Sequence, residues 1–273
     1  MTPERNRWLS LYALLVYAFL FAPIVVLIIF SFNSARRGLV WQGFTTKWYP
    51  QLFSNDELID ALTVTLEVAV VAVLVSTILG SLLGLGLARL RFRGRGATET
   101  LLLVPMITPE IVMGLALLLF FLQLFDAHGS LLQLWVAHIT FCVSYVAVVV
   151  RARATSMNPQ LEEAARDLGA SAWGAFRFVT LPIILPAVIA GALLAFSLSF
   201  DDYVVTTFNS GVGSSTLPLY IYGKIKFGVT PEINAISTII VATTALAILA
   251  AWRLGAFRGE ARTFVAEEDN PPG

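Results

Sequence analysis

Long stretches without a charged residue dominate the pattern of this 273-residue chain. A helix needs roughly 20 apolar residues to cross a hydrocarbon core about 30 Å thick. Five charge-free stretches reach that length, and a sixth stretch, 100–125, is interrupted only by Glu110. The five are 8–35, 68–88, 127–150, 178–200 and 233–252. The pattern therefore predicts an all-α, polytopic membrane protein.

The same pattern sets the expected organisation. We expect one six-helix transmembrane domain over 1–252, followed by a polar tail, 253–273, that is most simply disordered. The predicted spans lie near 9–32, 62–88, 101–124, 131–150, 181–200 and 233–252. A cleaved signal peptide is the alternative for the first span. However, its apolar run is about twice the length of a secretory core and lacks a convincing cleavage site.

Composition supports the membrane class and excludes others. The chain is 57% hydrophobic and only 13% charged, with a mean hydropathy of +0.78. Its 18 basic and 18 acidic residues cancel, which argues against a nucleic-acid binder. A single cysteine, Cys142, and two histidines, His128 and His138, leave no disulfide framework, and we expect no metal site.

The basic residues predict the orientation. With the N-terminus inside, the inner segments carry 13 of the 18 lysines and arginines, and the outer segments carry five. Positively charged loops stay on the cytoplasmic side of a membrane. Both termini are therefore predicted to be cytoplasmic. The four arginines between Arg89 and Arg95 are explained by this topology alone.

The segment between the fourth and fifth spans, 151–180, is more than a connector. Residues 162–168 are strong helix formers after Asn158-Pro159, and Gly169 can adopt the positive φ that ends a helix. Ser171 can then cap a second short helix over 172–178. Pro182 and Pro186 mark the start of the fifth span. The sequence thus predicts a helix–glycine–helix elbow on the cytoplasmic face.

Two interpretations of this elbow stand side by side. It could be a surface helix that rests on lipid headgroups, with Leu161 and Leu168 on one side. It could instead be a docking element whose small-residue face enters a partner's cleft while Glu163 meets a basic side chain. Local composition alone does not separate them.

A specific pattern in the elbow favours docking. E-A-A, three residues, G, nine residues and V-x-L-P resembles the signature loop of binding-protein-dependent ABC importer permeases. The residues are Glu163, Ala164, Ala165 and Gly169, then 179–182, which contains Leu181 and Pro182. The resemblance implies that these six named residues form the coupling site for an ATPase subunit.

The likeness continues along most of the chain. WQGFTTKWY at 41–49, FSLSFDDYVVTTFNSG at 196–211 and LPLYIYGKIKFGVTPEINAIST at 217–238 resemble the spermidine/putrescine importer permeases. This implies a type I ABC importer permease fold in a bacterial inner membrane. It also implies a second homologous permease, two ATPase subunits and an extracytoplasmic substrate-binding protein as partners. The chain itself would be no enzyme and hold no cofactor, because ATP and Mg would bind the ATPase subunits.

Acidic residues near the spans are candidates for the substrate path. A carboxylate inside the membrane is costly and usually faces a bundle interior or water. The candidates are the acids Glu67, Glu110, Asp201 and Asp202, together with the neighbouring Tyr203. Glu67 could also be an interfacial residue, Glu110 could simply start a helix after Thr108-Pro109, and the aspartates could be ordinary loop acids. A polyamine would favour carboxylates for its charges and aromatic faces for cation–π contact.

Two other features of the spans favour structural roles. Gly80 and Gly84 form a ridge of small residues suited to close helix packing. His138 is more simply a buried hydrogen-bonding residue than a ligand. Neither is assigned a transport role.

The sequence therefore predicts a permease subunit that forms part of a polyamine path and couples to an ATPase through the elbow. One alternative is the same architecture for another small solute. A second is a self-sufficient channel or secondary transporter, and a third is a membrane scaffold without flux.

Overall fold

The computed structural model describes residues 7–35, 40–125 and 129–253. Within these ranges the regular elements are helices, apart from one isolated bridge between Asn33 and Phe44. The predicted all-α class is confirmed. Contacts divide the chain into two compact units, one formed by Met1–Asp56 with Gly223–Gly273 and the other by Glu57–Tyr222. The predicted tail lies outside the described residues beyond Arg253.

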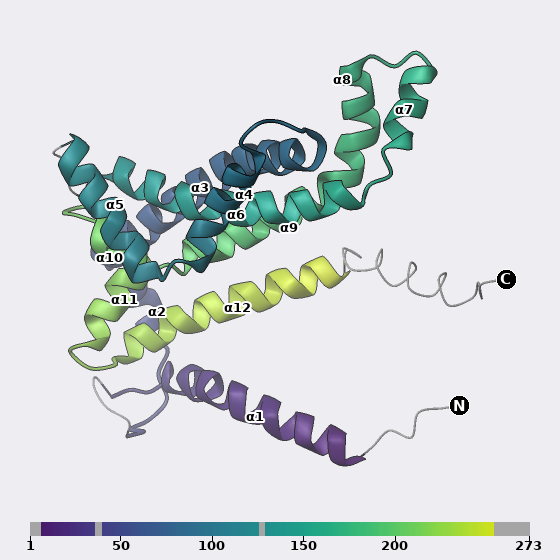
Figure 1. The fold of residues 1–273 in the computed structure, drawn as a ribbon. Coiled ribbons are helices and arrows are strands. Elements are labelled where there is room, and N and C mark those ends of the chain that lie inside the picture. The colour runs from purple at the N-terminus through teal and green to yellow at the C-terminus, as the bar shows by residue number, and fades with distance from the viewer. Residues whose placement is uncertain (1–6, 36–39, 126–128, 254–273) are drawn as a thin grey trace. The chain divides into compact units, whose positions relative to one another are not determined.

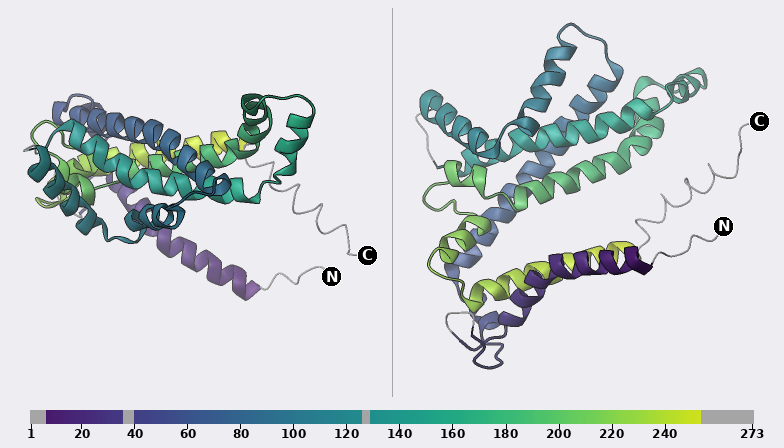
Figure 2. Two further views of the ribbon diagram at one scale, coloured as in Figure 1. Left: turned by 45° about the horizontal axis from the view of Figure 1, so that its top comes forward. Right: turned by 60° about the horizontal axis from the view of Figure 1, so that its bottom comes forward.

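The first unit joins both ends of the chain. It holds α1 (Arg7–Phe30), α2 (Trp48–Leu52) and α12 (Pro231–Arg253), and α12 runs alongside α1 (Figures 1 and 2). The buried Asn33 side chain holds the loop after α1, because its Oδ1 accepts from Gln42 N at 2.9 Å. The Trp48 indole donates to the Asn33 carbonyl at 2.7 Å.

The second unit carries the remaining helices, the last of which continues past the boundary at Tyr222 into the first unit. In chain order they are α3 (Asp56–Arg89), α4 (Arg95–Ile107), α5 (Glu110–Phe125), α6 (Leu131–Ser156), α7 (Gln160–Asp167), α8 (Ala172–Ala175), the π-helix η1 (Phe176–Thr180), α9 (Leu181–Phe200), α10 (Val204–Asn209) and α11 (Leu217–Ile225). The buried core lies mainly between α6 and α9, where Cys142, Val146 and Ala195 are fully buried. α7 and α8 stand beyond the adjoining ends of α6 and α9 (Figure 1).

Length and composition identify the membrane-spanning candidates. Four helical stretches qualify alone: Trp8–Phe30, Asp56–Arg89, Leu131–Ser156 and Ala172–Phe200. The bent pair α4 and α5 makes a fifth if it counts as one span. α12 contributes a shorter apolar stretch, Pro231–Leu246. These stretches overlap the six predicted from the sequence, and four or five of them qualify as spans by length and composition.

The predicted span near 101–124 is not one continuous helix. α4 and α5 meet at an angle of 112° across Thr108 and Pro109. Steric clash with a following proline ring disfavours the helical region, and Thr108 is extended, with ψ of 131°. The chain therefore turns at this dipeptide before α5 begins at Glu110.

The fifth span begins earlier than predicted. The short helix expected over 172–178 does not stand apart, because α8, η1 and α9 form one helical stretch, Ala172–Phe200. Ser171 caps its start as predicted, since its hydroxyl accepts from Gly174 N at 3.1 Å. Pro182 has no N–H to donate and lies in the first turn of α9. The wide π turn before it lets the helix continue.

The ridge at Gly80 and Gly84 packs closely against α6, as predicted. A Cβ at Gly84 would lie 2.5 Å from the Ala147 carbonyl oxygen, and one at Gly80 would lie 2.7 Å from Val146 Cβ. Both clashes involve α6 atoms that cannot move freely. By contrast, a Cβ at Gly86, on the same helix, meets nothing within 4 Å.

We expect Gly84→Ala to lower the free energy of unfolding by about 1–3 kcal/mol, because α3 and α6 must separate. Gly86→Ala is the matched control and should stabilise α3 by up to about 1 kcal/mol through helix propensity alone. Thermal denaturation of the two variants in one detergent measures the difference. Equal stability of the two variants would contradict the close packing.

Candidate functional site

Four of the five predicted path residues line one pocket of about 310 Å³. The pocket lies where the start of α5, the end of α9 and the start of α10 meet. Its polar lining residues include Glu110, Asp201, Asp202, Tyr203 and Tyr145. The fifth candidate, Glu67, is exposed on α3 and does not line this pocket. The structure thus brings together residues that are up to 93 positions apart in the sequence.

Glu110 reaches the pocket because of the break before it. Pro109 closes the first turn of α5, where the Met113 N–H donates to the Pro109 carbonyl at 3.1 Å. Glu110 is the first residue of the helix, and its side chain is exposed. The positive end of the helix dipole favours a carboxylate there. The structural and functional interpretations of Glu110 are therefore both compatible with this geometry.

The two adjacent aspartates differ in environment. Asp202 is 7% exposed, and its carboxylate accepts from Val205 N at 3.1 Å and from Thr206 N and Oγ1 at 2.8 Å. These bonds cap the start of α10. Asp201 ends α9 with an exposed side chain. Asp201 is therefore the aspartate free to meet a solute, and Asp202 positions the corner between α9 and α10.

Asp201 also has altered acidity. Partial burial raises the pKa of the Asp201 carboxyl, a backbone hydrogen bond opposes that rise, and the charge of Asp202 adds to it. The raised pKa means that acidification removes the Asp201 charge earlier than it would from an ordinary aspartate. The pocket therefore loses negative charge as the pH falls.

His138 fixes the corner from the α6 side. The fully buried ring lies between Ser199 Oγ, 2.8 Å from Nδ1, and Thr206 Oγ1, 3.1 Å from Nε2. Asp202 Oδ2 lies 3.6 Å from Nε2. The prediction of a buried hydrogen-bonding histidine is confirmed. Within the described ranges, no group of three or more His, Cys, Asp or Glu side chains gathers as a metal-ligand set.

Aromatic rings near the acids serve partly for packing. Tyr203 lies against Tyr222 with ring centroids 4.3 Å apart, and Phe200 stacks on Phe196 at 5.4 Å. Tyr203 lines the pocket, whereas Phe200 does not. Of these rings beside the aspartates, Tyr203 is the one that lines the pocket and could meet a cation there.

The helix, the glycine turn and the Ser171 cap of the elbow form as the sequence predicts, whereas the second helix continues into α9. α7 ends before Gly169, whose φ of +90° lies in the left-handed region that favours glycine. Glu163 and Ala164 are exposed, and Leu168 is 90% exposed at the tip. Ala165 is half-buried. After the turn, Leu181 is half-buried and Pro182 is exposed at the start of α9.

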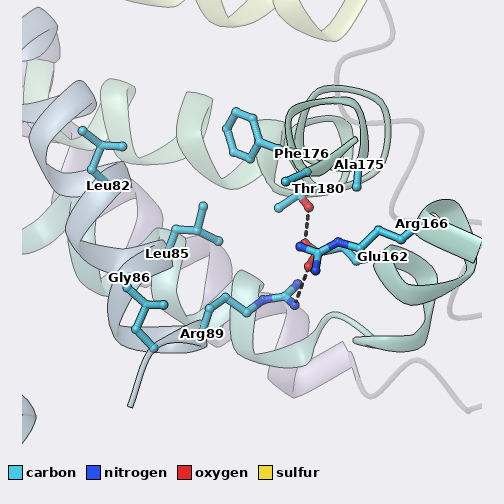
Figure 3. Close-up of a pocket in the computed structure, with 11 residues that line it drawn as sticks. Leu82, Leu85, Gly86, Arg89, Glu162, Arg166, Ala175, Phe176 and Thr180 are labelled. Carbon is cyan, nitrogen blue, oxygen red and sulfur yellow. Dashed lines mark hydrogen bonds and ion pairs between the residues drawn. The ribbon is translucent and has the colours of Figure 1, made fainter. Parts of the chain in front are cut away.

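The structure adds a residue to the elbow that motif reasoning missed. The Glu162 carboxylate accepts a hydrogen bond from Thr180 Oγ1 and pairs with Arg89 Nη1 at 3.1 Å (Figure 3). The membrane topology therefore does not fully explain the presence of Arg89, which also pairs with Glu162. Only the opposite charges of Arg89 and Glu162 could have signalled the pair, and they are 73 residues apart.

A second ion-pair group lies elsewhere on the second unit. Glu99 on α4 pairs with Arg151 on α6 at 2.7 Å and with Arg95 at 2.9 Å. Arg95 was likewise assigned to topology alone, and that assignment is also incomplete. The group ties α4 to α6.

Solved structures share this arrangement of helices. A bacterial alginate ABC transporter, in complex with an alginate pentasaccharide-bound periplasmic protein, aligns with a TM-score of 0.70 at 19% identity. The alignment covers 93% of this chain and 96% of the matched chain. An amino acid ABC transporter aligns with a TM-score of 0.57 over 79% of this chain and 100% of the matched chain. The fold is therefore shared with chains of solved ABC transporters.

Sequence comparison establishes the family. The profile described as "Binding-protein-dependent transport system inner membrane component" matches residues 76–257. The putrescine transport system permease PotI of Escherichia coli K12 is 41% identical over 256 residues, which cover 92% of this chain and 91% of PotI. The spermidine/putrescine permease PotC of Haemophilus influenzae is 45% identical over 238 residues, covering 86% of this chain and 91% of PotC.

The chain belongs to the binding-protein-dependent inner-membrane permease family. It is a multi-pass membrane subunit and not a catalytic one. The predicted resemblance to spermidine/putrescine permeases is confirmed, because PotC of Escherichia coli K12 is also 44% identical over 86% of this chain and 89% of its own length.

Proposed function

We propose that this chain is a permease subunit of an ATP-driven importer of polyamines such as putrescine and spermidine. The observation that carries the proposal is the pocket that places the Glu110 and Asp201 carboxylates beside Tyr203. A polyamine combines several positive charges with a flexible apolar stem. Carboxylates match the charges, and the tyrosine ring offers a cation–π face. The curated relatives named for putrescine and spermidine transport support the same substrate class.

The topology in this proposal has six spans with both termini in the cytoplasm. The bent pair α4 and α5 counts as one span, and α12 supplies the sixth. The positive-inside bias then puts the elbow on the cytoplasmic side. The pocket lies at the other end of α9 from the elbow, because α9 runs from Leu181 to Phe200, next to Asp201.

The partners follow from the same proposal. A second homologous permease completes the path, two ATPase subunits bind ATP and Mg, and an extracytoplasmic binding protein delivers substrate. The exposed Glu163 and Leu168 at the tip of the elbow are the contacts for one ATPase subunit. Closure of the ATPase dimer would favour the outward-facing state through contacts that differ between the two states.

Reconstitution tests this function. Vesicles that hold the full complex, with labelled putrescine or spermidine outside and the binding protein present, should accumulate label only when ATP reaches the ATPase subunits. Uptake of a labelled sugar instead of either polyamine would point to another solute. Flux through the purified chain alone would support a self-sufficient channel or secondary transporter. Partner binding without any flux would support a scaffold.

A further inference from the structure

Glu162 joins three segments that are distant in the sequence. One carboxylate oxygen accepts from the Thr180 hydroxyl, and the other lies 3.1 Å from Arg89 Nη1. Arg89 is the last residue of α3, and Thr180 is the last residue before α9. Figure 3 shows the carboxylate between these two side chains. A single side chain of α7 therefore contacts the adjoining ends of two long helices.

Packing does little to hold α7 in place. None of its eight residues is buried. The space beside it is a pocket of about 310 Å³ lined by Leu82, Leu85, Phe176 and Arg166, among others. Glu162 and Arg89 are shielded, with side-chain exposures of 21% and 22%. Because apolar contact is sparse here, the charge-assisted bonds of Glu162 fix the orientation of α7.

We propose that Glu162 is a positioning residue that transmits movement of the elbow to α3 and α9 together. This inference rests on the proposed function, because it requires an ATPase that moves α7. The adjacent Glu163 is exposed and is the docking contact of the proposed function, whereas Glu162 connects α7 to the membrane helices through Arg89 and Thr180. The two adjacent glutamates thus have different roles.

The contacts of Glu162 with Arg89 and Thr180 also connect α7 to the pocket at the other end of α9. α9 has 20 residues and spans about 30 Å at 1.5 Å per residue. Its first residue follows Thr180, and Asp201 follows its last residue. A displacement of Glu162 that moves Thr180 therefore also moves α9, and Asp201 follows the other end of this helix. Loss of the Glu162 contacts should leave docking intact and weaken the coupling of ATP hydrolysis to transport.

The test measures polyamine uptake and ATP hydrolysis in the same vesicles holding the full complex. In Glu162→Ala we expect the ATPase to remain bound and to hydrolyse ATP. Uptake per ATP should fall about tenfold or more, because the change removes both the bond from Thr180 and the bond from Arg89. Thr180→Val keeps the ion pair and should give a smaller fall. The charge swap of Arg89→Glu with Glu162→Arg should recover part of the ratio.

Glu99→Gln is the matched control, because it breaks a similarly exposed ion pair of the same unit that joins α4 to α6. Its uptake per ATP should equal that of the unchanged chain. An unchanged ratio in Glu162→Ala would overturn the transmission role, and so would complete loss of ATPase binding in that variant. If the unchanged chain bound no ATPase at all, the proposed function itself would be overturned.

Discussion

Glu163→Arg combined with Leu168→Asp is expected to abolish stable binding of the ATPase subunit. The double change reverses the charge of the exposed glutamate and places a charge where an apolar tip should be buried. Unpaired charges in an interface cost about 2–5 kcal/mol, so the affinity should fall about 100-fold or more. Co-purification of the ATPase with the tagged permease, followed by titration in detergent, measures the loss.

Arg93→Ala is the control for this experiment. Arg93 is exposed in the connection between α3 and α4 and lies outside the elbow. The control should bind the ATPase like the unchanged chain. The binding protein should still recognise substrate in both variants. Normal ATPase affinity in the double variant would contradict docking and would favour the alternative, in which the elbow is a surface helix that rests on lipid headgroups.

Asp201→Asn should impair polyamine uptake without loss of assembly. The change removes a negative charge from the pocket at nearly constant volume. A hydrogen bond to a charged group contributes about 1.5–3 kcal/mol, so uptake below saturation should fall about tenfold or more. Asp202→Asn is the informative comparison, because it should loosen the cap of α10 and lower thermal stability.

The pH profile separates a charge effect from a packing effect. Because the pKa of Asp201 is raised, uptake by the unchanged chain should begin to decline at a higher pH than it would with an aspartate of ordinary pKa. Asp201→Asn has no charge to lose, so this part of the decline should be absent. Uptake at the wild-type level with an unchanged pH profile in Asp201→Asn would make the acid an ordinary loop residue.

The sequence predicts much of this fold because its signals are local. Charge-free stretches locate the helices, Pro109 predicts a restart at Glu110, and Gly169 with Ser171 predicts the elbow. The bend of 112° was not predictable, because a proline indicates a break but not its angle. The extra turns before Leu181 were missed because a proline is typical of a helix start, whereas the π turn of η1 precedes Pro182 and the helical stretch begins at Ala172.

In the candidate site, too, the sequence identifies single residues but not how the fold arranges them. Glu110, Asp201 and Tyr203 were identified as single residues, and the fold brings them to one pocket. From the sequence alone, Asp201 and Asp202 are equivalent candidates for the substrate path. Only the hydrogen bonds to Val205 and Thr206 separate them. Ion pairs such as Arg89 with Glu162 depend on the meeting of distant helix ends, which no local pattern records.

In the proposed function, an ATPase subunit binds the elbow after α6. Leu168→Cys tests it directly, because Leu168 is 90% exposed and Cys142, the native cysteine, is fully buried. A photoactivatable cross-linker attached at position 168 in the assembled complex should join this chain to the ATPase subunit, in a yield that changes when ATP is added. Cross-linking to lipid alone, with or without ATP, would contradict the account.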